Sequence, residues 1–151
     1  MPKLTDETSM AADPLAARRC RKVIEFTGGA GLGAVGTVAL FTVTGAVLVR
    51  IAAVCTEDLT EAAPTATLSL GTAANPATII AGTNAVNIDV GEVWIDATPA
   101  VIKSWAVVIA YVIGDGADIV ATVGAQNITD GTMEFDCFWT PITANGFVGP
   151  A

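Results

Sequence analysis

The chain has 151 residues and a net charge of −8, with 15 acidic side chains, seven cationic ones and no histidine. The lack of histidine excludes Ser-His-Asp and Cys-His catalysis and imidazole ligation of a metal. One domain is expected at this length, and the charged fraction of 15%, against roughly 25% in soluble domains, favours a surface that meets other subunits.

The positive charge is concentrated at the N-terminus. Residues 1–22 hold five cationic and three acidic side chains, which give a net charge of +2. Residues 23–151 hold two cationic and twelve acidic side chains, which give a net charge of −10. We therefore predict a basic N-terminal arm at 1–22 and a single acidic body at 23–151. The body would repel nucleic acid, whose binding depends on neutralising phosphates, so no nucleic-acid partner is expected. The cations of the arm are Lys3, Arg18, Arg19, Arg21 and Lys22.

An uncharged segment at 26–49 follows the arm and is long enough to span a bilayer. Six glycines and four threonines give the segment a low helix propensity. Its apolar pattern also continues beyond Arg50, without the charged boundary that ends a membrane span. We therefore predict strands here and no membrane partner, with a membrane-anchored surface protein as an alternative.

From residue 23 onward the pattern is typical of β structure, with short β-branched runs between turn residues. A glycine-rich loop is predicted at 28–36 and a polar, acidic loop at 56–64. The strands predicted in this part lie at 23–27, 38–44, 46–56, 65–70, 77–80, 85–89 and 92–95.

The last third of the chain predicts a three-strand antiparallel meander. Nine apolar residues at 105–113 suit a strand covered on both faces, and Gly114-Asp115-Gly116 suits a hairpin that returns through 118–123. Asp130-Gly131 predicts another turn before 132–140. In that last strand, alternation places four large side chains on one face: Met133, Phe135, Cys137 and Trp139.

About ten short strands and no convincing amphipathic helix predict an all-β fold, an antiparallel β-sandwich or jelly-roll-like body with an extended N-terminal arm. The aromatic residues are most simply core or subunit-interface residues. The interface candidates are Phe41, Trp94, Trp105, Tyr111, Phe138 and Trp139.

Few patterns in the chain carry chemistry. Residues 31–36 match the dinucleotide-binding pattern GxGxxG, but the following residues are β-branched and do not predict the required helix, so a loop is expected. Acids at turns are usually solvated turn-formers, and three widely spaced cysteines predict no disulfide framework and no zinc site. We expect neither an enzyme nor a bound cofactor or metal. The acids in question are Asp89, Glu92, Asp96, Asp115 and Asp118.

Most of the body resembles a group of small virion proteins of tailed bacteriophages. The resemblance begins at residue 23, covers little of the arm and consists of strand-and-turn patterns. The segments that carry it are 26–34 (FTGGAGLGA), 41–45 (FTVTG), 47–50 (VLVR), 66–73 (ATLSLGTA), 89–94 (DVGEVW), 115–119 (DGADI) and 135–139 (FDCFW).

The resemblance implies a head decoration, or cement, protein on the capsid exterior, made in the host cytoplasm. Such a protein bridges neighbouring major capsid subunits, stabilises the expanded capsid and forms a homo-oligomer, with a trimer favoured. The basic arm would then dock on the capsid shell and add a strand to a neighbouring sheet. The alternative is a tail, neck or fibre module of the virion that contacts the host surface.

Overall fold

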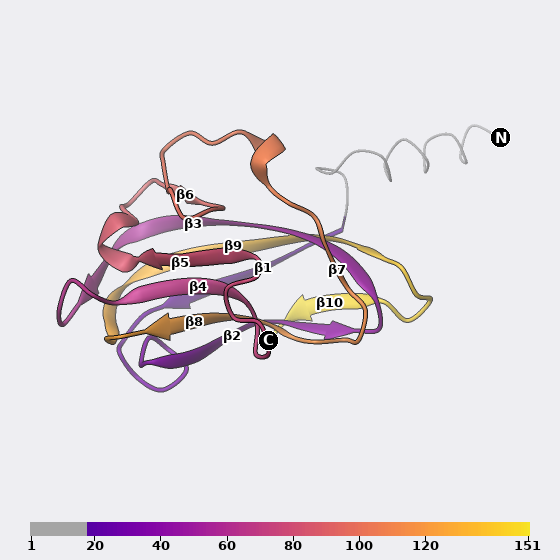
Figure 1. Cartoon of the computed structure of the whole chain (residues 1–151), viewed down its shortest axis with the longest axis horizontal. Coiled ribbons are helices and arrows are strands. Elements are labelled where there is room, and N and C mark those ends of the chain that lie inside the picture. The colour runs from indigo at the N-terminus through magenta and orange to yellow at the C-terminus, as the bar shows by residue number, and fades with distance from the viewer. Residues whose placement is uncertain (1–17) are drawn as a thin grey trace.

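Two antiparallel five-stranded sheets, packed face to face, make up the body of the protein (Figure 1). The computed structural model describes residues 18–151. Sheet 1 contains β1 (Arg18–Glu25), β9 (Ile128–Pro141) and β3 (Val47–Glu61) in that order, with β6 (Val93–Trp94) and β7 (Tyr111–Ile113) both paired to the free side of β3. Sheet 2 runs β10 (Phe147–Pro150), β2 (Gly36–Thr44), β8 (Ile119–Gly124), β4 (Thr67–Thr72) and β5 (Ile80–Asn84).

The strand pairing is that of a jelly roll. Strand β1 pairs with β9, β2 with β8, β3 with both β6 and β7, and β4 with β5. Strands from the first part of the chain therefore pair with strands from its later part. Strand β10 adds a further partner to β2. The predicted all-β sandwich is confirmed, and its connectivity is that of the two-sheet folds described for jelly rolls.

The core lies between the sheets because alternate side chains of each strand point inward. In β3, every second residue from Val47 to Cys55 is buried. In β9, the four large side chains predicted to share one face are all buried, which confirms that prediction.

Strand β2 shows one break in this alternation. Leu40 and Phe41 are adjacent and both fully buried. The ladder to β8 pairs Ala39 with Val120 and then Phe41 with Ile119, so Leu40 is the extra residue of a β-bulge. The bulge re-aims the strand, and both side chains enter the core.

One hydrogen bond joins the two sheets inside the core. Trp94 of β6 is fully buried, and its Nε1 donates to Oγ1 of Thr83 in β5 at 3.0 Å. The indole also packs edge-to-face on Phe135 of β9, with ring centroids 6.4 Å apart. Sheet 1 and sheet 2 are thus connected by a polar contact as well as by apolar packing.

Sheet 1 begins closer to the N-terminus than predicted. The predicted arm ended at residue 22, but residues 18–22 already belong to β1 and pair with β9 from Arg18↔Trp139 onward. The expectation of an arm for these five residues is wrong because their backbone completes the edge of sheet 1. Lys3 and the rest of 1–17 lie outside the described residues.

The predicted meander of the last third is wrong. Residues 105–113 are not one buried strand: η2 (Trp105–Val107), a 3₁₀ turn, opens the segment, and only Tyr111–Ile113 form a strand, β7, which pairs with β3. Strand β8 lies in the opposite sheet from β7 and β9. The predicted turn at Asp130-Gly131 falls inside β9, where β3 and β9 shift register.

Three other local predictions also change. Strand β3 continues to Glu61 through the predicted acidic loop, because β9 pairs with it as far as Ile128. Residues 85–87 form a 3₁₀ turn, η1 (Ala85–Asn87), instead of a strand, and the predicted strand at 77–80 is replaced by β5 at Ile80–Asn84. No helix among residues 18–151 is long and apolar enough to cross a membrane, and residues 26–49 form a loop, β2 and the start of β3.

We predict that Thr83→Val destabilises the fold while Thr83→Ser does not. Valine keeps the shape of threonine but leaves the buried indole N–H of Trp94 without an acceptor, which costs about 1–3 kcal/mol. Serine retains the hydroxyl and serves as the matched control. Urea denaturation would measure both free energies of unfolding, and equal values for the two variants would contradict a structural role for this bond.

Candidate protein-docking surface

The basic residues of β1 face the acidic residues of β9 on the outer side of sheet 1. Arg19 and Arg21 lie at alternate, outward positions of the edge strand. The Nε atoms of Arg19 and Arg21 lie 3.3 Å and 3.1 Å from Oδ1 of Asp136, and Arg21 also approaches Glu134 at 3.6 Å. The hydrogen bond to Asp136, reinforced by its charge, raises the pKa of Arg21, which stays positive at all working pH values.

The other two cations of this strand also have partners within the chain. The Arg18 guanidinium lies 5.3 Å from the ring centroid of Trp139, and Lys22 Nζ donates to the main-chain oxygen of Ala151. An exposed ion pair contributes only about 0–1 kcal/mol, so external acids can compete for the arginines. The capsid-docking role expected for these residues stays a prediction.

The six interface candidates divide into core and surface residues. Phe41 and Trp94 have no exposed surface and Trp139 is 7% exposed, so these three belong to the core of the subunit. Trp105, Tyr111 and Phe138 are half-buried. Only the second group is placed where a partner could touch it.

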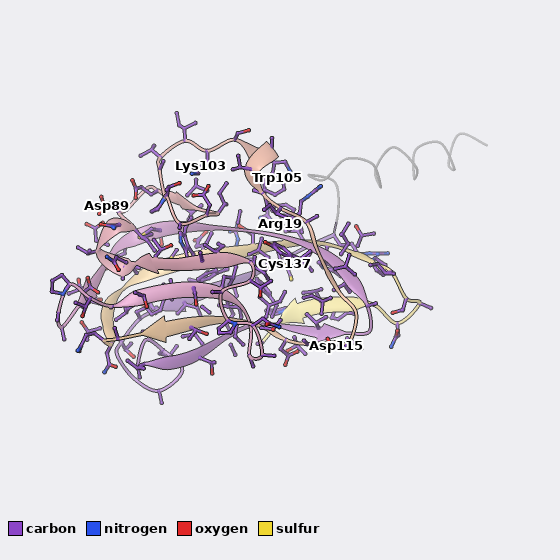
Figure 2. All side chains as sticks on the ribbon, in the orientation of Figure 1. Arg19, Asp89, Lys103, Trp105, Asp115 and Cys137 are labelled. Carbon is purple, nitrogen blue, oxygen red and sulfur yellow. The ribbon has the colours of Figure 1, made fainter. Side chains whose placement is uncertain are left out.

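Phe138 is the point at which the outer side chains of sheet 1 meet. It lies opposite Arg19 of β1 on one side and opposite Arg50 of β3 on the other. Trp105 packs edge-to-face on its ring at 5.0 Å between centroids, and the Arg19 guanidinium lies 5.9 Å from the same ring. Figure 2 shows Trp105 and Arg19 approaching this place from η2 and from β1. A basic strand and an apolar loop therefore form one continuous surface.

The loop that carries Trp105 connects β6 to β7 and projects beyond the edge of sheet 1 (Figure 1). We call residues 97–112, which include the first two residues of β7, the apolar loop. Five of its six valine and isoleucine side chains are exposed, Ile102 by 87%, and the sixth, Val108, is buried. Soluble proteins seldom leave such side chains together on the surface without a binding role. The exposed aliphatic residues are Val101, Ile102, Val107, Ile109 and Val112.

Polar contacts hold the apolar loop in a defined shape. Lys103 Nζ lies 2.8 Å from Oδ2 of Asp96 and donates to the carbonyl of Thr98, while Oδ1 of Asp96 accepts from the backbone N–H of Thr98. Partial burial alone would raise the pKa of Asp96, but the bonds from Lys103 and Thr98 outweigh it and lower that pKa. Ser104 accepts from the N–H of Ala106 and caps η2. The loop thus presents its aliphatic side chains on an ordered backbone.

A groove of about 440 Å³ adjoins this surface, between the turn that joins β4 to β5 and the strand β7. Tyr111 lines the groove together with Ile79, Ile113 and Asp115. The lining is mainly aliphatic and aromatic, which suits an apolar side chain of a partner more than a charged substrate.

The acids singled out in the sequence act mainly as turn-formers in the structure. Asp115 accepts from the N–H of Ala117 and Glu92 from that of Asp89, whereas Asp118 accepts from the N–H of Val43 in β2, 75 positions away. Among residues 18–151, no three side chains of the metal-binding types gather at one place. The segment that matches GxGxxG leads into strand β2 and not into a helix, so it lacks the N-terminal dipole that binds pyrophosphate.

The sequence did not predict the apolar loop because residues 105–112 were assigned to a buried strand. The available signal was Ser104 directly before the apolar run, because serine there caps the 3₁₀ turn η2. The position of Trp105 on Phe138 had no local signal, because the two residues lie 33 positions apart.

No family model matches the chain, and no curated protein or solved structure shows significant similarity to it.

Proposed function

We propose that this protein is a non-enzymatic structural component of a bacteriophage particle, a decoration protein that binds the outside of the head. The single observation that supports it most is the continuous surface formed by the apolar loop, Phe138 and the cationic edge strand β1. Protein interfaces favour aromatic residues and arginine, and the buried centre of an interface is more apolar than the rest of the surface. The sequence resemblance to small virion proteins gives this surface its proposed partner.

In this proposal the surface has two kinds of partner. The exposed aliphatic residues of the apolar loop bury against sister subunits in a homo-oligomer, with a trimer favoured. Arg19 and Arg21, together with residues 1–17, contact acids of the major capsid protein, and repetition over several subunits gives avidity to individually weak contacts. Bridging of neighbouring capsid subunits would stabilise the expanded shell.

The most direct test is imaging of the particle with and without this protein. Extra density on the icosahedral lattice of the head would support the decoration role. Density on the tail, neck or fibres would favour the alternative virion module that contacts the host surface. Particles of identical appearance would contradict both.

We predict that Ile102→Asp abolishes assembly without unfolding the subunit. Ile102 is 87% exposed, so the change costs little stability in the monomer, but a charge in the centre of an apolar interface weakens association by at least about tenfold. Sedimentation velocity would measure the oligomer, and co-sedimentation with expanded empty capsids would measure binding.

Val35→Asp is the matched control for this experiment. Val35 is an exposed aliphatic residue, 56% accessible, in the loop before β2 and outside the proposed surface. The Val35→Asp substitution adds the same charge to the subunit as Ile102→Asp does. The proposed interface would be refuted if both variants assembled and bound like the wild type, or if both failed equally.

We predict that deletion of residues 1–17 weakens capsid binding and leaves the body intact. A deletion through residue 22 would also remove five of the eight residues of β1, so that result could not separate docking from folding. The shorter deletion retains the ladder of β1 with β9, and its free energy of unfolding should equal that of the full chain. Occupancy on empty capsids should fall by about tenfold or more as the avidity of many N-terminal segments is lost. Full occupancy would exclude a docking role for 1–17.

A further inference from the structure

Two of the three cysteines lie directly opposite each other in sheet 1. Cys20 of β1 pairs with Cys137 of β9 in the antiparallel ladder, and both thiols are free in the structure. Directly opposed residues have Cα atoms about 4.5–5.5 Å apart, within the range of about 4.4–6.8 Å that a disulfide spans. We propose that Cys20 and Cys137 form a reversible cross-strand disulfide that fastens the edge strand β1 to β9. The inference does not rest on the proposed virion function.

The two sulfurs differ in access, as a directional exchange reaction requires. Cys137 has no exposed surface, whereas Cys20 is half-buried in the edge strand of its sheet. A small disulfide reagent in solvent therefore reaches Cys20 first. Figure 2 labels Cys137 within the body of the sandwich.

The environment of the pair supports the same order of attack. A hydrogen bond from the Cys137 side chain lowers the pKa of Cys20, although burial and the charge of Asp136 oppose this effect. The same hydrogen bond, burial and the negative charge of Cys20 raise the pKa of Cys137. Because a thiolate is the nucleophile in thiol–disulfide exchange, Cys20 is the attacking residue and Cys137 the resolving one.

The reaction balances with a small-molecule disulfide, such as glutathione disulfide, as oxidant. The Cys20 thiolate attacks one sulfur of the reagent, the S–S bond breaks, and one small thiolate leaves. Cys20 then carries no charge, which removes one of the causes that raise the pKa of Cys137. Cys137 loses its proton to solvent and attacks Cys20 Sγ, and the second small thiolate leaves. The protein is oxidised by two electrons and the reagent is reduced to two thiols.

The third cysteine supplies an internal control. Cys55 is fully buried in β3, its Sγ donates to the carbonyl of Glu57 at 3.1 Å, and burial raises its pKa to about 11. Cys55 pairs with Met133 in the ladder between β3 and β9, so it does not lie opposite another cysteine. Cys55 should therefore remain a thiol under conditions that oxidise the other two.

The consequence of the bond would be a fixed edge strand. Strand β1 has β9 as its only partner in sheet 1 within the described residues, so its attachment depends on one ladder. A covalent link between residues 20 and 137 closes most of the chain into a loop and restricts the unfolded state. The docking face, which includes Arg19 and Arg21, would be held in place at the same time.

The experiment uses the folded full-length protein, equilibrated with mixtures of reduced and oxidised glutathione, quenched with acid and alkylated under denaturing conditions. The expected product is a monomer two hydrogen atoms lighter, with one alkylated cysteine, and with Cys20 and Cys137 joined in the peptide map. Its midpoint of thermal unfolding should exceed that of the reduced protein by at least about 5 °C.

Matched variants keep the result interpretable. Cys55→Ser should still form the bond, while Cys20→Ser should show neither the mass change nor the thermal shift. Cys20 is half-exposed, so its replacement retains the fold even if the buried Cys137→Ser variant is unstable. Three alkylated cysteines in the oxidised wild type, a bond that includes Cys55, or a bond only between chains would each overturn the proposal.

Discussion

The ladder between β3 and β9 is the interaction on which the rest of the structure depends. These are the two longest strands, and they pair from Val47↔Pro141 to Glu61↔Ile128. On its outer sides the ladder positions β1 against β9 and both β6 and β7 against β3. Because side chains alternate between the faces of a strand, this one pairing builds the core on one face and the proposed docking surface on the other.

The docking surface follows from the same alternation. Phe138 stands between the buried Cys137 and Trp139, so it must point outward, where Trp105 and Arg19 pack on it. The apolar loop forms because β6 and β7 both pair with β3, and the sixteen residues between them, 95–110, belong to no strand of either sheet. Most of the aliphatic side chains of the apolar loop stay in solvent, which a stable monomer seldom tolerates, and this is the physical reason for proposing assembly.

Local patterns predicted several elements well. The strand at 132–140 and its buried face, the loop at 28–36 and the strand at 38–44 all appear in the structure. Errors arose where local signals resembled those of another element. The apolar run at 105–113 has the composition of a buried strand but starts in a 3₁₀ turn, and Asp130-Gly131 has the composition of a turn but accommodates a register shift between β9 and β3. At Asp130-Gly131 the partner strand β3 decided the conformation, and at 105–107 the cap of Ser104 accompanies the 3₁₀ turn.

The sequence by itself determined the all-β class, the inward and outward faces of the best strands and the exclusion of histidine chemistry, because composition and two-residue periodicity are properties of short segments. Tertiary structure alone decided that residues 18–22 complete a sheet, that Trp105 packs on Phe138 and that Cys20 faces Cys137. The partners in these contacts are separated by between 33 and more than 100 residues, and no local pattern encodes such pairing. It emerges only when both sheets bury their apolar faces together.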